Sequence, residues 1–354
     1  MKVLIVISNA GIGGTQRVAI NLASWMNQTE EHSALVVSLE DFDGNKYDTS
    51  AIPYRQIEKG TSKILGLISV IRECRPDIVL SMGVPMAVYT VPACLITHAK
   101  HIVSERNDPA HFAGKSIIRV LSRCFMKWAD AYVFQTKEAQ AFYGGSVAGR
   151  SAVIPNPLFS AERMPTAPYA GERKKTIVSV GRLSRQKNQR ILIEAFYELQ
   201  PFICDYQLII WGEGAERERL NELISALKLQ DKVSLPGSTD KVFDEIYEAG
   251  LFVLCSDFEG MPNALMEAMA LGLPCISTDC PCGGPRELIR NGVNGILVPV
   301  GDKEALKTAI LHLVNQPAEL REEMQNMAFR IRETHSLESI CQSWYKYFSE
   351  VKAL

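Results

Sequence analysis

Two glutamates eight residues apart, Glu259 and Glu267, lie in the segment whose residue types best fit ligand chemistry. The apolar run 251–255 predicts a buried strand, Pro262 suits the first turn of a following helix, and Gly272 ends that helix. The helix is apolar on nearly every face except at Glu267. Burying an unpaired charge costs several kcal/mol, so this carboxylate needs a partner.

Glu259 falls in the loop between this strand and this helix. In a parallel α/β sheet such loops form the ligand-binding rim, and the start of the helix offers free N–H groups to an anion. The segment therefore offers two carboxylates that can bind sugar hydroxyls and, between them, a helix start that can bind an anion. The alternative is a satisfied core glutamate beside an ordinary acidic loop.

The whole pattern over 259–268 is Glu-Gly-x-Pro-Asn-x-x-x-Glu-Ala. It resembles the paired-glutamate motif of family 4 glycosyltransferases, in which two Rossmann-like domains face a cleft (the GT-B arrangement). That family transfers sugar from a nucleotide diphosphate donor with retention of anomeric configuration. The resemblance implies that Glu259 meets the donor sugar and that Glu267 meets the ribose hydroxyls. It also implies that the diphosphate faces the backbone of Met261, Pro262, Asn263, Ala264 and Leu265.

A second motif, Gly181-Arg-Leu-Ser-Arg-Gln-Lys-Asn188, follows an expected strand over 176–180. Arg182 and Lys187 bracket a strand-to-helix loop, where two fixed cations can hold a diphosphate; alternatively they are a pair of surface charges. The motif matches the Gly-Arg-Leu-x-x-x-Lys element of the resembled family, which implies that both side chains stabilise the leaving diphosphate. The same resemblance implies that Gly181 and the turn glycines Gly212 and Gly214 adjoin the nucleotide.

With 354 residues, the chain is long enough for two domains, each with its own core. Strands and helices alternate along it, which predicts α/β architecture with two Rossmann-like parallel sheets. We expect an acceptor-binding domain over 1–157, a nucleotide-sugar domain over 158–336 and a final helix over 337–354 that packs back on the first domain, as in the family. One of the expected helices covers 242–249.

The net charge of −2 hides an asymmetry, because residues 1–157 hold sixteen Lys and Arg against thirteen Asp and Glu. The nine cysteines are scattered, which suits a reducing compartment, and Cys280-Pro-Cys282 lacks a zinc spacing. Without a leader or a membrane-spanning run we expect a cytosolic protein, in peripheral contact with the inner face of the cytoplasmic membrane. No metal and no cofactor are expected, because no suitably placed Asp-x-Asp run is present and two cations replace a bridging Mg²⁺.

Two segments of the first domain are candidates for the acceptor side. The glycine loop with Gly13, Gly14 and Arg17 follows a strand, but it breaks the dinucleotide fingerprint at Gln16. In the family this loop lines the cleft. The polar run Glu105, Arg106 and Asn107 follows another strand, and a solvated loop is the alternative reading.

The stretch 115–128 is a basic amphipathic helix by its spacing. Its basic stripe is formed by Lys115, Arg119, Arg123 and Lys127. The apolar residues Ile118, Leu121, Phe125 and Trp128 are expected to form the packed face. The stripe is either the solvated side of a packed helix or a site for anionic lipid headgroups or a lipid-linked diphosphate.

The chain resembles the bacterial surface-polysaccharide or lipid-linked-oligosaccharide type of this family, and that resemblance implies a retaining hexosyltransferase that uses UDP-hexose or UDP-N-acetylhexosamine. The partners expected are the nucleotide sugar, a glycan or lipid-linked acceptor of surface polysaccharide synthesis and an anionic membrane, and no nucleic acid. A nucleotide-sugar epimerase and a non-catalytic glycosyltransferase-like binding subunit are the alternatives. A dinucleotide oxidoreductase is disfavoured by the broken glycine fingerprint.

Overall fold

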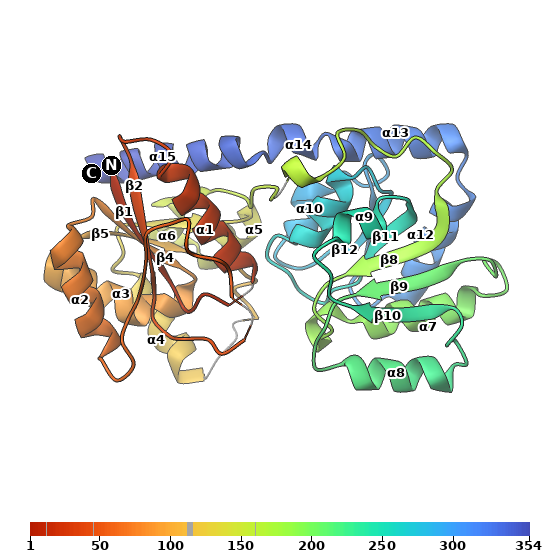
Figure 1. Ribbon diagram of the computed structural model, residues 1–354, viewed down its shortest axis with the longest axis horizontal. Helices are drawn as coiled ribbons and strands as arrows, with labels where there is room; N and C mark the ends of the chain where they lie inside the picture. The colour runs from red at the N-terminus through yellow and green to blue at the C-terminus, as the bar shows by residue number, and fades with distance from the viewer. Residues whose placement is uncertain (12, 45, 112–115, 160) are drawn as a thin grey trace. The chain divides into compact units, whose positions relative to one another are not determined.

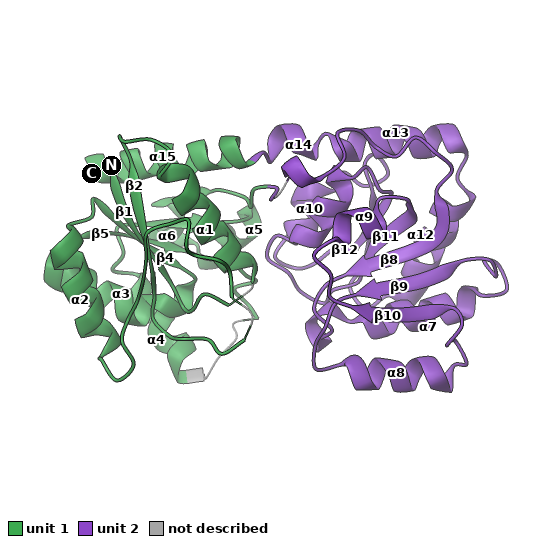
Figure 2. Cartoon of the chain, in the orientation of Figure 1, with its two compact units in different colours: residues 1–157, 337–354 green, residues 158–336 purple. Residues whose placement is uncertain are grey.

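A parallel sheet organises each half of the chain in the computed structural model, which describes residues 1–11, 13–44, 46–111, 116–159 and 161–354. The chain divides into two units by its internal contacts. Unit 1 comprises Met1–Pro157 and Leu337–Leu354, and unit 2 comprises Leu158–Ser336 (Figure 2).

The sheet of unit 1 has seven parallel strands in the order β3-β2-β1-β4-β5-β6-β7 (Figure 1). Its strands are β1 (Lys2–Ile7), β2 (Ser33–Ser38), β3 (Tyr54–Gln56), β4 (Ile78–Met82), β5 (Lys100–Ser104), β6 (Ala131–Phe134) and β7 (Ser151–Val153). The central strands are runs of Val, Ile and Leu with almost no exposed surface, as expected where helices cover both faces of a parallel sheet.

The helices of unit 1 are α1 (Gly14–Met26), α2 (Lys63–Cys74), α3 (Ala87–Thr97), α4 (Ser116–Met126), α5 (Lys137–Tyr143), α6 (Gly145–Ala148) and α15 (Leu337–Ala353), with a 3-10 turn η1 (Val84–Met86). Local signals fix several of their ends. Thr136 caps α5 by accepting a hydrogen bond from Ala139 N–H, and Arg75 ends α2 in the left-handed conformation.

The sheet of unit 2 has six parallel strands in the order β10-β9-β8-β11-β12-β13. Its strands are β8 (Lys174–Val180), β9 (Gln207–Trp211), β10 (Val233–Gly237), β11 (Ala249–Leu254), β12 (Cys275–Thr278) and β13 (Ile296–Val298). Strand order reverses between β8 and β11, so the chain leaves these two neighbouring strands toward opposite faces of the sheet.

The helices of unit 2 are α7 (Gln189–Leu199), α8 (Arg217–Ala226), α9 (Val242–Ile246), α10 (Asn263–Ala270), α11 (Gly284–Leu288), α12 (Lys303–Asn315), α13 (Ala318–Phe329) and α14 (Ile331–Thr334), with 3-10 turns η2 (Ala161–Arg163) and η3 (Arg185–Lys187). The helix expected over 242–249 was wrong at its end. It stops at Ile246, because Ala249 already pairs with Lys174 of β8 at the start of β11.

The last helix, α15, belongs to unit 1 although it follows unit 2 in sequence. Its apolar stripe of Ile340, Trp344, Phe348 and Val351 is buried. Glu338 accepts a 2.6 Å hydrogen bond from Trp25 Nε1 of α1, which fixes one end of α15. Burial of this stripe supplies part of the core of unit 1.

Replacing Trp344 by Ala removes the largest fully buried side chain of unit 1 and leaves a cavity under α15. We expect the free energy of unfolding of unit 1 to fall by about 3–5 kcal/mol. Denaturant unfolding followed by circular dichroism measures it. Ser343→Ala, one residue away on the exposed side of the helix, should change the midpoint very little. Equal unfolding midpoints for the two variants would contradict the packing described here.

Candidate active site

The carboxyl ends of β8 and β11 meet at the reversal point of the second sheet. Ligands of open α/β sheets bind outside the carboxyl ends of the strands at such a point. The loop after β8 carries Arg182 and Lys187, and the loop after β11 carries Glu259. The topology therefore brings the two motifs of the sequence to one edge of one sheet.

An ion pair joins these two loops. Lys187 Nζ donates a hydrogen bond to Glu259 Oε1 at 2.5 Å, and the two side chains are only 19% and 10% exposed. The fully buried Ser256 donates a second hydrogen bond to the same carboxylate oxygen at 2.7 Å. Charged hydrogen bonds of this kind are strong, and removing one partner would leave the other charge buried and uncompensated.

Further hydrogen bonds fasten the loops on either side of the ion pair. Asn188 Nδ2 donates to Asp257 Oδ1 at 2.7 Å, and Asp257 N–H donates to Gln186 O at 2.8 Å. Gln186 Nε2 donates to Phe258 O at 2.8 Å. Asn188 has φ 45°, a left-handed conformation that asparagine tolerates better than most residues, and it lets α7 start directly after Lys187.

Glycine allows a third loop to lie directly beneath the loop of Glu259. A Cβ atom on Gly284 would stand 1.7 Å from Gly260 O, so only a glycine fits. Thr278 at the end of β12 supports the same loop from below, because its hydroxyl donates to Ser256 O at 2.6 Å. The backbone of the acidic loop thus has fixed neighbours on both sides.

The turn Gly212–Gly214 lies against the loop that begins at Gly181. Gly212 and Gly214 have φ 139° and 159°, and Cβ atoms there would meet Gly181 O at 2.0 Å and Leu183 O at 2.2 Å. Leu183 N–H donates to Glu213 O at 2.9 Å. The three glycines singled out by resemblance are therefore neighbours in the structure.

Arg182 is exposed, and its guanidinium makes no hydrogen bond or ion pair within the described ranges. Glu267 is half-buried in α10. Pro262 stands directly before the first helical residue, Asn263, instead of in the first turn as expected. The N-cap residue of α10 is Pro262, whose side chain has no hydrogen-bond acceptor, so α10 lacks the usual N-cap side chain at that position.

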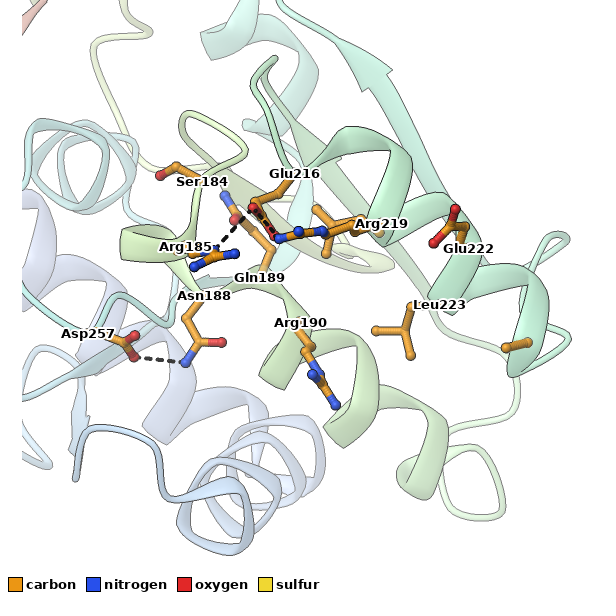
Figure 3. A pocket seen from close by; sticks show the side chains of 12 residues that line it. Ser184, Arg185, Asn188, Gln189, Arg190, Glu216, Arg219, Glu222, Leu223 and Asp257 are labelled. Atoms are coloured by element: carbon orange, nitrogen blue, oxygen red, sulfur yellow. Dashed lines mark hydrogen bonds and ion pairs between the residues drawn. The ribbon is translucent and has the colours of Figure 1, made fainter.

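A hollow of about 700 Å³ opens beside these loops, between the start of α7 and α8 (Figure 3). Asn188 and Asp257 form one side, and Arg185, Glu216 and Arg219 form another. Glu216 accepts from Arg219 at 3.1 Å and lies 3.6 Å from Arg185. The sequence motifs did not single out Glu216 or Arg219, because helix α8 reads as an ordinary charged helix.

In unit 1, Glu105 and Arg106 lie inside the loop that follows β5, and their place on the acceptor side stays a prediction. Both are buried, at 5% and 7% exposure, whereas Asn107 is exposed. Glu105 accepts hydrogen bonds from its neighbours' N–H groups and from Tyr143 Oη at 3.0 Å. Arg106 donates to Asn156 Oδ1 and to Ile154 O. These two side chains hold the loop from inside, so Asn107 is the residue of this run that faces outward.

Burial raises the pKa of Glu105 to about 7, although the hydrogen bonds to its carboxylate favour the charged form and act to lower the pKa. Burial also lowers the pKa of Arg106 to about 9. In the glycine loop, Gly13 and Arg17 are half-buried and Gly14 is exposed at the start of α1. Their contact with an acceptor stays a prediction.

Helix α4 is oriented differently from the sequence expectation. Lys115 lies outside the described residues, and only Lys127 of the basic stripe is fully exposed. Arg119 and Arg123 are half-buried, and Arg123 donates to Pro109 O at 2.7 Å. Leu121 and Trp128, expected in the packed face, are exposed. The reason is that Ser122 and Met126 occupy the buried side instead.

No helix of the described segments is both long enough and apolar enough to cross a bilayer. In the same segments no three His, Cys, Asp or Glu side chains are grouped so that they could hold a metal ion.

Residues 162–330, nearly all of unit 2, match the family model "Glycosyl transferases group 1". A glycosyltransferase of Methanocaldococcus jannaschii is 31% identical over 66% of this chain, and the match spans 62% of that relative's length. The Campylobacter jejuni protein named GalNAc-alpha-(1->4)-GalNAc-alpha-(1->3)-diNAcBac-PP-undecaprenol alpha-1,4-N-acetyl-D-galactosaminyltransferase is 25% identical over 99% of both chains. This chain is therefore similar to the group 1 glycosyltransferases over residues 162–330.

The solved structure of Anabaena Alr3699/HepE, determined in complex with UDP, covers 99% of this chain and 100% of its own, with a TM-score of 0.81 at 20% identity. The expected fold class of two Rossmann-like parallel sheets, the GT-B class, is therefore confirmed. The expected glycosyltransferase activity class is confirmed by the family and its named relatives. The roles of individual site residues remain predictions.

Replacing Gly284 by Ala tests the packing beneath the acidic loop. The added methyl group must displace the backbone of Gly260, because no flexible side chain is there to move. We expect a loss of about 3 kcal/mol in the free energy of unfolding of unit 2 and at least a tenfold loss of sugar transfer. Gly149→Ala in unit 1, whose Cβ would make only ordinary contacts, is the control and should leave both quantities unchanged. A fully active, fully stable Gly284→Ala protein would refute the close approach.

Glu105→Gln tests the buried carboxyl group of unit 1. The folded-state pKa of Glu105 is raised to about 7 from an ordinary 4.5, so its contribution favours folding at low pH and is lost as the pH rises toward 7. Between pH 5 and pH 8, the free energy of unfolding of the wild type should fall relative to that of Glu105→Gln, by about 2–3 kcal/mol in total. Urea unfolding at stepped pH values measures the difference. Parallel stability curves for the two proteins would mean that Glu105 titrates normally.

Proposed function

We propose that the protein is a retaining glycosyltransferase that moves a hexose or N-acetylhexosamine from a UDP-linked donor to a glycan or lipid-linked acceptor in surface polysaccharide synthesis. The observation that carries this proposal is the ion pair between Lys187 and Glu259 at the reversal point of the second sheet. It sets a cation for phosphate beside a carboxylate for sugar hydroxyls, within the residues that match the group 1 glycosyl transferase model. The Campylobacter jejuni relative, whose name includes diNAcBac-PP-undecaprenol, supports a lipid-linked acceptor.

In this proposal the donor diphosphate lies against Lys187, the exposed Arg182 and the start of α10. As the bond to the sugar breaks, negative charge grows on the diphosphate, and fixed cations and the helix N-terminus stabilise it. Arrival of the diphosphate gives Lys187 a second anionic partner. One oxygen of Glu259 can then turn toward a donor sugar hydroxyl while Ser256 still donates to the carboxylate.

Glu267, half-buried in α10, is assigned to the ribose hydroxyls. Retention is proposed to come from front-face attack, in which the leaving phosphate accepts the proton of the acceptor hydroxyl. This scheme needs no cofactor and no metal, since side-chain cations take the place of a bridging ion. Transfer should therefore continue in excess EDTA, and its loss would overturn the metal-free part of the scheme.

The enzyme is proposed to work at the inner face of the cytoplasmic membrane, where a nucleotide sugar and a lipid-linked acceptor meet. Incubation with a panel of radiolabelled nucleotide sugars and a lipid-linked acceptor fraction tests this. We expect label in the lipid fraction with one UDP-sugar, in the same anomeric form as the donor. Conversion of the UDP-sugar to its epimer without acceptor would instead identify an epimerase, and no turnover at all would indicate a binding subunit.

Lys187→Ala and Arg182→Ala test the cationic site. We expect each to lower kcat by about 100-fold or more, because each removes a charge that stabilises the leaving group. Arg185→Ala is a matched control from the same loop, since its side chain is 80% exposed and pairs only with Glu216. Circular dichroism and thermal unfolding establish that the variants are folded. Near-wild-type rates for Lys187→Ala or Arg182→Ala would contradict the assignment.

A further inference from the structure

One side of helix α4 in unit 1 exposes apolar residues instead of polar ones. Ile117, Val120, Leu121 and Trp128 are 66%, 57%, 40% and 60% exposed, and Cys124 between them is exposed as well. Ile117, Val120 and Leu121 recur at helical spacing on one side of α4, and Trp128 lies in the turn directly after the helix. A helix that packs on a soluble domain normally directs its polar side outward, which α4 does not do.

The end of helix α3 extends this apolar side. Leu95 and Ile96 are 55% and 53% exposed, and α3 packs beside α4 (Figure 1). A small pocket of about 240 Å³ has Leu95 of α3 and Trp128, which follows α4, among its lining residues, so the exposed apolar residues of α3 adjoin Trp128. We call Leu95, Ile96, Ile117, Val120, Leu121 and Trp128 the α3–α4 surface. Exposed apolar patches of this kind mark interaction sites in soluble proteins.

Cations accompany the α3–α4 surface. Lys127 is exposed beside Trp128, Arg119 is half-buried on the same helix, and Lys100 lies on the lining of the shared pocket. The stretch 116–128 contains no Asp or Glu, and the nearby Asp130 lies 3.7 Å from Lys100. The face therefore combines an apolar centre with positive charge.

We propose that the α3–α4 surface docks on an anionic lipid bilayer. Ile117, Val120, Leu121 and Trp128 enter the boundary between headgroups and acyl chains, and Lys127 and Arg119 meet lipid phosphates. Tryptophan suits this boundary because its ring is apolar and its N–H is polar. The sequence pattern left the basic stripe as either a solvated side or a site for lipid headgroups or a lipid-linked diphosphate. In this proposal the apolar side of α4 makes the contact instead, because Arg123 already donates to Pro109 O.

Charge decides between a bilayer and a second copy of this chain. A symmetric dimer through this surface would place the cations of one copy against those of the other, with no acidic residue of α4 to pair with them. A bilayer that contains phosphatidylglycerol supplies both the negative charge and the apolar phase. The docking proposal rests on the membrane location given in the proposed function, but not on the donor chemistry proposed for unit 2.

Binding to lipid vesicles tests the proposal with the full-length protein. The wild type should sediment with phosphatidylcholine vesicles that contain phosphatidylglycerol, more weakly with phosphatidylcholine alone, and less as salt is raised. Trp128 is the most exposed of the four tryptophans, as Trp25 and Trp211 are half-buried and Trp344 is buried. Emission should therefore shift to the blue on binding, and this shift should disappear in Trp128→Phe while sedimentation persists.

The double substitution Val120→Ser with Leu121→Ser should weaken the partition coefficient about tenfold or more. Lys127→Gln should weaken it about fivefold on anionic vesicles. Leu65→Ser is the matched control, because Leu65 is 64% exposed on α2 of the same unit. All variants should keep the wild-type rate of nucleotide-sugar hydrolysis without vesicles. If neither the wild type nor any variant hydrolysed a nucleotide sugar, that result would count against the proposed transferase function and not against the docking proposal.

Three outcomes overturn the docking proposal. The first is absence of binding to anionic vesicles, and the second is an equal loss of binding in Leu65→Ser and in the double variant. The third is a dimer in light scattering that the double variant dissolves, which would assign the surface to a second copy of the chain.

Discussion

The buried pair of Lys187 and Glu259 is the constraint on which the second unit depends. Moving either charge away from water is costly, and the pair is stable only if both side chains and their remaining hydrogen-bonding atoms are held in place. Ser256 donates to the carboxylate of Glu259, and hydrogen bonds between the 184–188 and 255–259 loops hold the segments that carry the two side chains. The adjacent carboxyl ends of β8 and β11 bring those loops together. The order of the strands thus determines where the two loops lie, and the loops determine where the ion pair forms.

Glycine has a definite place in this arrangement. Gly284 and the pair Gly212 and Gly214 let backbone approach backbone at distances no side chain would permit. Such contacts fix the loops without side chains that would fill the space needed by a ligand. The same reasoning explains why this edge combines small residues with a few strongly held charges, which a preorganised site for a charged ligand requires.

Much of the fold could be predicted from the sequence because its strands are short, strongly apolar runs separated by helices. Where the prediction failed, tertiary contacts decided the outcome. The helix expected to reach Ala249 ends earlier because Gly250 lies against the carbonyls of Lys174 and Thr176, where β11 must join the sheet. The three-residue β3 went unnoticed, since Tyr54–Gln56 is largely exposed and carries little apolar pattern.

The residues of the candidate site were predictable by type and by loop, but their partners were not. Lys187 and Glu259 are 72 positions apart, and no local pattern reveals that they pair. Glu105 and Arg106 looked like a polar surface run for the same reason. Their partners Tyr143, Ile154 and Asn156 come from later segments, and only the folded chain shows that these polar groups are buried and hydrogen-bonded to them.

The two units differ in net charge, so the overall field of each unit has to be considered apart from the few charges close to the candidate site. Residues 337–354 contain two Lys and two Glu, so unit 1 has the same net charge of +3 as residues 1–157. Since the whole chain has a net charge of −2, unit 2 has a net charge of −5. A unit of negative net charge does not attract a diphosphate by its overall field. In the proposed function, binding of the diphosphate there depends on short-range groups, namely Arg182, Lys187 and the start of α10. In the docking proposal, long-range attraction to an anionic surface comes instead from unit 1, the unit that carries the α3–α4 surface.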